Sequence, residues 1–140
     1  MKTITAQNLR NTITGVLPQC LPFTSATGYE IPHLDEVKRF LRENEVDRLP
    51  FIDGVLECEL YALFLFTDMK EKMVKRKKVK HWAFGFAFGL MWNGEVAEHT
   101  ANVFVAHNKG KINVYCCEPQ TDEVWILNPL RDIIFKIDFL

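Results

Sequence analysis

The run from Trp82 to Trp92, WAFGFAFGLMW, constrains the fold more than any other stretch of the chain. Its residues alternate strictly between bulky side chains at even positions and Ala, Gly or Met at odd positions, which is the period of a β-strand. This strand therefore has one bulky side and one nearly flat side. Asn93 and Gly94 follow directly and form the strongest two-residue hairpin signal, so the strand should turn back into a second one.

A second hairpin signal lies at residues 108–110, Asn-Lys-Gly, between two runs rich in β-branched and aromatic residues. A loop made of residues 108 and 109 places His99 directly opposite Glu118. A loop made of residues 109 and 110 places Gln120 opposite His99, with Glu118 on the diagonal. In either register the imidazole gains an acceptor that fixes its protonated nitrogen and leaves the other nitrogen free to act as a base.

Cys58 is the candidate nucleophile that such a histidine would serve. It stands in or just before the first turn of a helix whose residues 60–66 are apolar on every side, so we expect that helix to be buried. Unpaired N–H groups and the helix dipole favour a thiolate there, whereas Glu57 and Glu59 oppose it. We predict that this helix packs on the flat side of the aromatic strand, formed by Ala83, Gly85, Ala87 and Gly89.

The remaining segments point to an α+β fold. Asp35 should cap a short helix over residues 35–44, and further strands are expected at residues 124–127 and 132–139. Residues 1–28 are poorly defined, with one short edge strand at most. We predict a single domain over residues 1–140, in which a buried helix packs on an antiparallel β-meander of four or more strands.

Charge and composition exclude several classes of partner. A net charge of −1 gives no electrostatic reason to expect nucleic acid or an anionic membrane, and the basic run 70–80 is expected to be a solvated helix end. No apolar run has the length of a signal peptide or of a membrane span, so we expect a soluble, cytoplasmic protein. The 4 cysteines lack CxxC spacing, which favours reduced thiols.

The order of these parts resembles papain-like thiol hydrolases, and within them the C-terminal domain of the fairy-ring mushroom agglutinin and its small bacterial and phage relatives. The resemblance covers roughly residues 29–127. It rests on the acidic-flanked Cys58, on the block Glu98–Phe104 and on Glu118-Pro119-Gln120-Thr121-Asp122.

The resemblance implies a papain-like fold and a cysteine peptidase that cleaves an amide bond of a peptide or protein. Cys58 would be the nucleophile, His99 the base and Glu118 the group that orients the imidazole, with Gln120 beside them. Gln19 is a candidate amide donor to the oxyanion. The family depends on calcium, which would engage acidic residues near the cysteine, here Asp53, Glu57 and Glu59.

Three other readings stay open. The chain could be a catalytically inactive papain-like scaffold or a phage accessory or binding protein. Cys58, His99, Glu118 and Cys116 could instead form a metal site, although they lack paired ligand spacing. The basic run 70–80 could serve a binding module, but aromatic residues do not interleave it, as they do in nucleic-acid sites.

Overall fold

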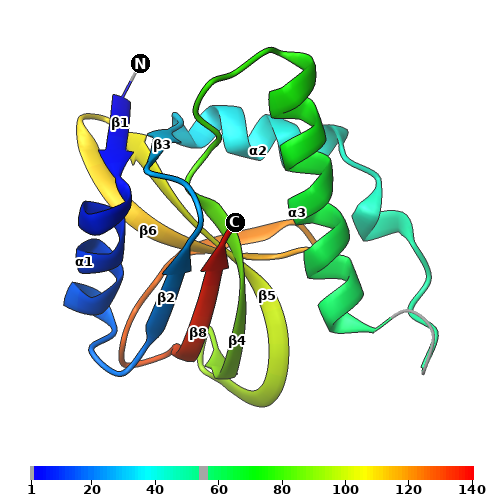
Figure 1. Cartoon of the computed structure of the whole chain (residues 1–140). Helices are drawn as coiled ribbons and strands as arrows, with labels where there is room; N and C mark the ends of the chain where they lie inside the picture. The colour runs from blue at the N-terminus through cyan, green and yellow to red at the C-terminus, as the bar shows by residue number, and fades with distance from the viewer. Residues whose placement is uncertain (1, 54–56) are drawn as a thin grey trace.

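The computed structural model describes residues 2–53 and 57–140, which form two sheets and three α-helices (Figure 1). The main sheet has six strands in the order β2-β8-β4-β5-β6-β7, and a separate antiparallel pair joins β1 to β3. The predicted α+β class is confirmed. The strands are β1 (Lys2–Thr5), β2 (Leu21–Thr24), β3 (Gly28–Ile31), β4 (Phe84–Trp92), β5 (Glu95–Asn108), β6 (Lys111–Glu118), β7 (Glu123–Ile126) and β8 (Ile133–Phe139).

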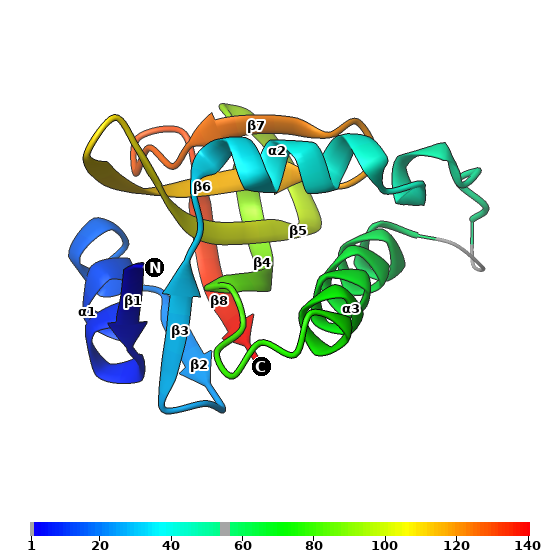
Figure 2. The same cartoon turned by 90° about the horizontal axis from the view of Figure 1, so that it is seen from above.

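The helices lie on opposite faces of the main sheet (Figure 2). The helix α1 (Ala6–Val16) packs on one face, and α2 (Leu34–Glu43) and α3 (Cys58–Lys75) pack on the other. A short 3-10 helix η1 (Val46–Arg48) follows α2. The helix expected over residues 35–44 is therefore present, but His33 rather than Asp35 caps it, since the His33 ring accepts the N–H of Asp35.

The first 28 residues, poorly defined by sequence alone, form β1, α1 and β2. Leu9 and Ile13 of α1 are buried in one core cluster with Ala83 and with Ala87 of β4. The segment is tied to the far end of the chain, because β2 pairs in parallel with β8. Each half of the sequence thus contributes to the main sheet.

The prediction that α3 packs on the flat side of β4 is wrong. Leu65, Phe66 and Met69 of α3 bury themselves against the bulky side, among Phe84 and Phe104. The small residues of β4 lie against elements other than α3. A Cβ at Gly85 would lie 2.4 Å from the carbonyl oxygen of Asp138 on β8, so its smallness permits close strand approach.

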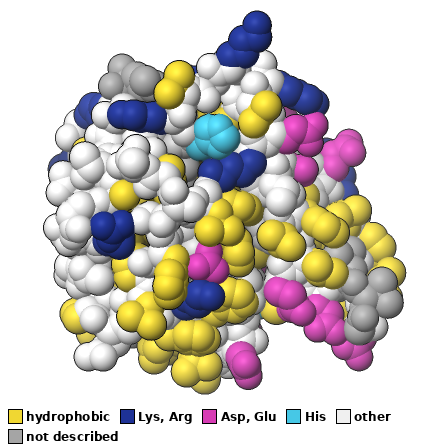
Figure 3. All heavy atoms as spheres, viewed as in Figure 1, with side chains coloured by type: hydrophobic (Ala, Val, Ile, Leu, Met, Phe, Trp, Pro, Cys, Tyr) yellow, Lys and Arg dark blue, Asp and Glu magenta, His cyan; other side chains and the backbone are white. Residues whose placement is uncertain are grey.

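Only part of the aromatic face is covered by helices. Figure 3 shows hydrophobic side chains gathered over the region of β2, β8 and β4 in the view of Figure 1. Phe23 is 49% exposed and Phe135 is 46% exposed, and Lys136 lies over the Phe23 and Phe88 rings. The helix α3 is not buried on every side as expected, since Leu63 and Phe64 also face solvent.

Both predicted hairpins are present. Asn93 and Gly94 have φ of 50° and 84°, and Lys109 and Gly110 have φ of 52° and 77°, so each pair forms the centre of a two-residue turn with two left-handed residues. Asn108 pairs with Lys111, which selects the second of the two registers considered. Glycine at the second turn position explains why this register forms. A loop of residues 108 and 109 would place Lys109, rather than Gly110, at the second turn position.

Among the described residues, no helix is both long and apolar enough to cross a membrane.

Candidate functional site

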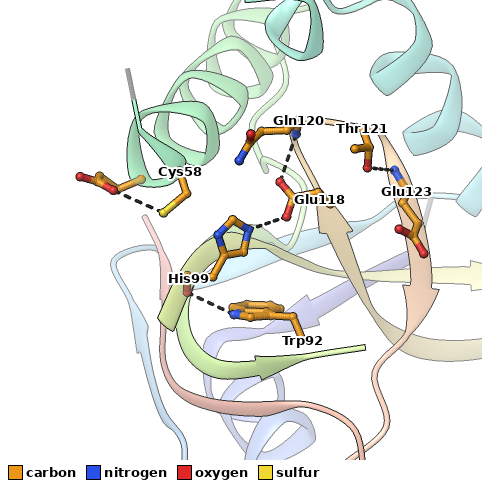
Figure 4. Close-up of polar contacts among 8 residues, drawn as sticks. Cys58, Trp92, His99, Glu118, Gln120, Thr121 and Glu123 are labelled. Carbon is orange, nitrogen blue, oxygen red and sulfur yellow. Dashed lines mark hydrogen bonds and ion pairs between the residues drawn. The ribbon is translucent and has the colours of Figure 1, made fainter. Parts of the chain in front are cut away.

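The centre of the candidate site is a contact between His99 on β5 and Glu118 at the end of β6 (Figure 4). The Nε2 atom of His99 contacts Oε2 of Glu118. The other carboxylate oxygen, Oε1, accepts the main-chain N–H of Gln120 at 3.2 Å. Both side chains are about one-fifth exposed. The imidazole is therefore held in one orientation by an anchored carboxylate.

Cys58 is the first residue of α3 and lies on one side of the imidazole. It shares a cavity of about 460 Å³ with His99 and Thr100. Its Sγ lies 3.4 Å from a carboxylate oxygen of Glu59, to which the thiol donates. Burial raises the pKa of the Cys58 thiol, Glu59 raises it further, and hydrogen bonding from Thr100 acts in the opposite direction. Of the two opposing effects expected from the sequence, the one from Glu59 acts together with burial, and the pKa of the thiol is raised.

Trp92 supports His99 from the other side. Its indole Nε1 donates to the carbonyl oxygen of His99 at 3.1 Å, and the two rings lie edge to face with centroids 6.1 Å apart (Figure 4). A register shift between Gly89 and Met91 turns Trp92 away from the bulky side that its even position predicted. Gly89 leaves room for the ring, since a Cβ there would lie 2.9 Å from it.

A second cavity, of about 330 Å³, opens beside His99 on the Trp92 side. We call it the tryptophan pocket. Its walls combine two indole rings with carboxylate, amide and hydroxyl side chains. The residues that line it are Trp92, Asn93, Glu95, Ala97, His99, Glu118, Thr121, Glu123 and Trp125. His99 lines both cavities and so separates the thiol from the tryptophan pocket.

Asp132 organises the wall of the tryptophan pocket. This carboxylate is 1% exposed and accepts the Asn93 N–H at 2.7 Å, the Trp125 Nε1–H at 3.1 Å and the Asn128 N–H at 2.9 Å. It thereby links the β4–β5 turn to β7. Asn93 extends the network, because its side-chain amide donates to Glu123 at 3.2 Å.

Among the other predicted residues, Glu57 and Glu59 line the cavity of Cys58, whereas Gln19 and Asp53 do not. Gln19 is exposed in the turn after α1 and lines neither cavity, so a role as oxyanion donor has no geometric support. The expectation that Asp53, Glu57 and Glu59 bind calcium stays a prediction. In the described parts of the chain, no group of three or more His, Cys, Asp or Glu side chains could hold a metal ion.

Sequence reasoning missed Thr100, Trp92, Trp125 and Asp132. Thr100 follows His99 directly, and its proximity could have been inferred from the placement of Cys58. The position of Trp92 beside His99 could not be predicted, because the only sign of the register shift in the sequence is Gly89. Asp132 stands between a loop and β8, a position that gives no sign of the three donors it collects.

No protein-family model and no curated protein matches the chain. Two solved structures share its fold. A complex of PSL1a with E64 has a TM-score of 0.81 at 17% identity. The lectin of Polyporus squamosus, bound to the human-type influenza-binding epitope Neu5Acα2-6Galβ1-4GlcNAc, has a TM-score of 0.78 at 15% identity. The chain therefore shares its fold with about half of each of these two chains.

The likeness covers 98% of this chain in both comparisons, but only 51% and 49% of the two lectin chains. This chain therefore spans about half the length of the lectins. The predicted resemblance to a mushroom agglutinin is supported in fold; the papain-like description and the bacterial or phage origin are not.

The comparisons overturn the prediction of a cysteine peptidase with a catalytic triad. The solved lectin carries a glycan epitope, which points to carbohydrate binding rather than to amide hydrolysis. The geometry agrees in one respect: the Cys58 thiol donates to Glu59 rather than to His99, and its pKa is raised. The comparisons give no support to the predicted peptide or protein partner either.

Proposed function

We propose that this chain is a carbohydrate-binding domain whose ligand site is the tryptophan pocket. The observation that carries the proposal is the lining of that cavity, which sets two indole rings among polar side chains. Sugar rings present apolar C–H faces and a rim of hydroxyl groups, so they suit a concave site that offers aromatic surface and several hydrogen-bonding groups.

The pocket is pre-organised for such a ligand. Asp132 fixes Trp125 and the main chain of Asn93, and Asn93 fixes Glu123. Because these groups are held before a ligand arrives, little conformational entropy is lost when it binds. The size also fits, since a cavity of about 330 Å³ holds a small ligand such as one or two sugar rings.

A glycan microarray probed with the purified chain, followed by calorimetric titration of the bound glycan, tests this proposal. Trp125→Ala should weaken binding about tenfold through loss of an aromatic wall. Ile126→Ala is the matched control, since Ile126 is the next residue of β7, is 55% exposed and does not line the pocket. Absence of any bound glycan, or equal affinity of Trp125→Ala and the wild type, would contradict the proposal.

A second candidate function is covalent capture of an electrophilic ligand at Cys58. The specific support is the structural similarity to PSL1a in its complex with E64, a thiol-alkylating epoxide. Here Cys58 would be the nucleophile, His99 the base and Glu118 the orienting group. The sulfur attacks an epoxide carbon, the C–O bond opens, and the proton that His99 takes from the thiol passes to the alkoxide.

Intact-mass analysis after incubation with E64 tests this second function. We expect one adduct, located at Cys58, and an adduct that forms about 100-fold more slowly in His99→Ala. Cys20→Ser is the control that should keep wild-type labelling, because burial raises the pKa of the Cys20 thiol to about 11. No adduct at Cys58, or equal rates in wild type and His99→Ala, would contradict it.

We also propose that the scaffold is papain-like in the arrangement of its parts. This is supported by a cysteine at the start of α3 and by a histidine and a glutamate on later antiparallel strands. Superposition of an experimental structure on papain-like proteins tests it, because a different order of the matched elements would refute it.

A further inference from the structure

The charge of the tryptophan pocket carries an inference about its ligand, and this inference rests on the proposed function. Three carboxylates line the cavity: Glu95, Glu118 and Glu123. Among the described residues that line it, there is no lysine and no arginine. Arg131 lies close by, but its guanidinium donates to the main-chain carbonyl of Asn93 and is not part of the lining.

Two of the three carboxylates, Glu95 and Glu123, have no ionic partner among the described residues. Glu118 is held by His99 and by the N–H of Gln120. Glu123 accepts a hydrogen bond from the neutral amide of Asn93, and neither it nor Glu95 forms an ion pair with any described residue. A ligand in the pocket therefore meets two carboxylates that form no ion pair with a described residue, on the wall formed by the β4–β5 turn and β7.

The aromatic wall favours the same ligand charge. The face of an indole ring carries negative electrostatic potential and attracts a cation placed over it. Trp92 and Trp125 line the cavity together with the carboxylates. Aromatic rings and carboxylates in one cavity match the recognition of an organic ammonium group.

We propose that the tryptophan pocket selects ligands that carry a protonated amine, and that its glycan ligands are amino sugars rather than acidic sugars. Glu95 and Glu123 supply the specificity. A sialic acid carboxylate placed in this cavity would face like charge with no cation to offset it, which is a penalty against the wrong ligand. The ligand chemistry thus differs from that of the sialylated epitope in the similar lectin structure.

Titrations at pH 6 in low salt, followed by two-dimensional NMR, test the inference with three probes. The first is the glucosamine trimer chitotriose, the second is its neutral N-acetylated counterpart, and the third is ethanolamine, an amine without a sugar. We expect chitotriose to bind about fivefold more tightly than the acetylated trimer, and added salt to reduce the difference.

The variants Glu95→Gln and Glu123→Gln should each reduce the preference for chitotriose, since both keep an oxygen acceptor and lose the charge. Glu45→Gln is the control, because it removes an equivalent charge from an exposed residue that does not line the pocket. Circular dichroism of each variant verifies that it is folded.

The outcomes separate this inference from the proposed function. Equal affinity for the two trimers overturns the inference and leaves carbohydrate binding intact. Binding of ethanolamine that depends on Glu95, without binding of either trimer, supports amine recognition and overturns carbohydrate binding. No binding of any of the three probes overturns both.

Discussion

The two sides of His99 differ in how firmly they are held. On the tryptophan side, a single buried carboxylate, Asp132, accepts three hydrogen bonds that join the β4–β5 turn to β7. On the thiol side, Cys58 contacts the exposed Glu59, and α3 is anchored to the sheet by the amide of Asn102. That amide donates to the carbonyl oxygens of Ala62 and Gly85 at 3.0 Å and 3.2 Å.

The tryptophan side is therefore a rigid recognition surface, whereas the reactive thiol on the other side is held more weakly. A buried carboxylate with three donors fixes its surroundings before any ligand binds. The thiol, by contrast, has its pKa raised by burial and by Glu59 and lowered by Thr100, so small changes nearby alter its reactivity. Four substitutions test this contrast.

Asp132→Ala should have the largest effect. It leaves three donors in a buried region without their acceptor, so the free energy of unfolding should fall by about 3 to 4 kcal/mol. Urea denaturation measures the change. Asp35→Asn, at an exposed site in the first turn of α2, should change it by less than about 0.5 kcal/mol. Similar losses in both variants would contradict the structural role of Asp132.

Asn102→Ala should destabilise the chain by about 2 kcal/mol, because it removes the two hydrogen bonds that anchor α3 and leaves a small void. Hydrogen exchange should show faster opening of α3 than of β7. Asn113→Ala, at a half-buried asparagine on β6, serves as the control. Uniform acceleration across both elements would show that Asn102 does not act locally.

Asp122→Asn should stabilise the chain at neutral pH by about 1 kcal/mol, a value reduced for solvent screening. Burial and then the neighbouring Asp47 raise the pKa of Asp122 from 3.8 to about 6. Since the native state holds this proton more tightly, the contribution of Asp122 to stability falls as pH rises from 3.8 to about 6.

Thermal unfolding at pH 4 and pH 7.5 checks this expectation. The variant should exceed the wild type only at the higher pH, and asparagine suits the site because residue 122 has a φ of 63°. A stability difference that is the same at both pH values would refute the effect.

Glu59→Gln should have the smallest effect, a roughly two- to threefold faster alkylation of Cys58 by iodoacetamide at pH 8. The carboxylate of Glu59 raises the pKa of the thiol, so its removal increases the thiolate fraction. Cys58→Ser identifies the reacting thiol by abolishing the signal. An unchanged rate would show that Glu59 does not control the thiol.

The β-hairpins could be predicted from the sequence because their signals are local. Alternation along residues 82–92 and the Asn93-Gly94 turn required no knowledge of distant contacts. The contact between His99 and Glu118 followed from the same hairpin geometry. The register of the β5–β6 hairpin could be narrowed to two alternatives, and Gly110 at the second turn position decided between them.

The parts that sequence reasoning missed depend on contacts between distant segments. The apolar residues of α1 keep helical spacing, but the helix is short and contains Gly15 and several Thr and Asn residues of low helix propensity, so its burial in the core becomes visible only in the folded chain. The flatness of β4 suggested a docked helix, but Gly85 instead accommodates the backbone of β8. A register shift at Gly89 likewise moved Trp92 to an unexpected face.

The pairing of β2 with β8 has a consequence for how the molecule forms during synthesis. The last of the described strands in the sequence, β8, occupies an interior place in the main sheet, between β2 and the aromatic strand β4. Until residues 133–139 emerge, β2 has no neighbour and one edge of β4 stays open. Completion of the main sheet must therefore await the synthesis of β8, and an aromatic strand edge stays accessible to chaperones in the meantime.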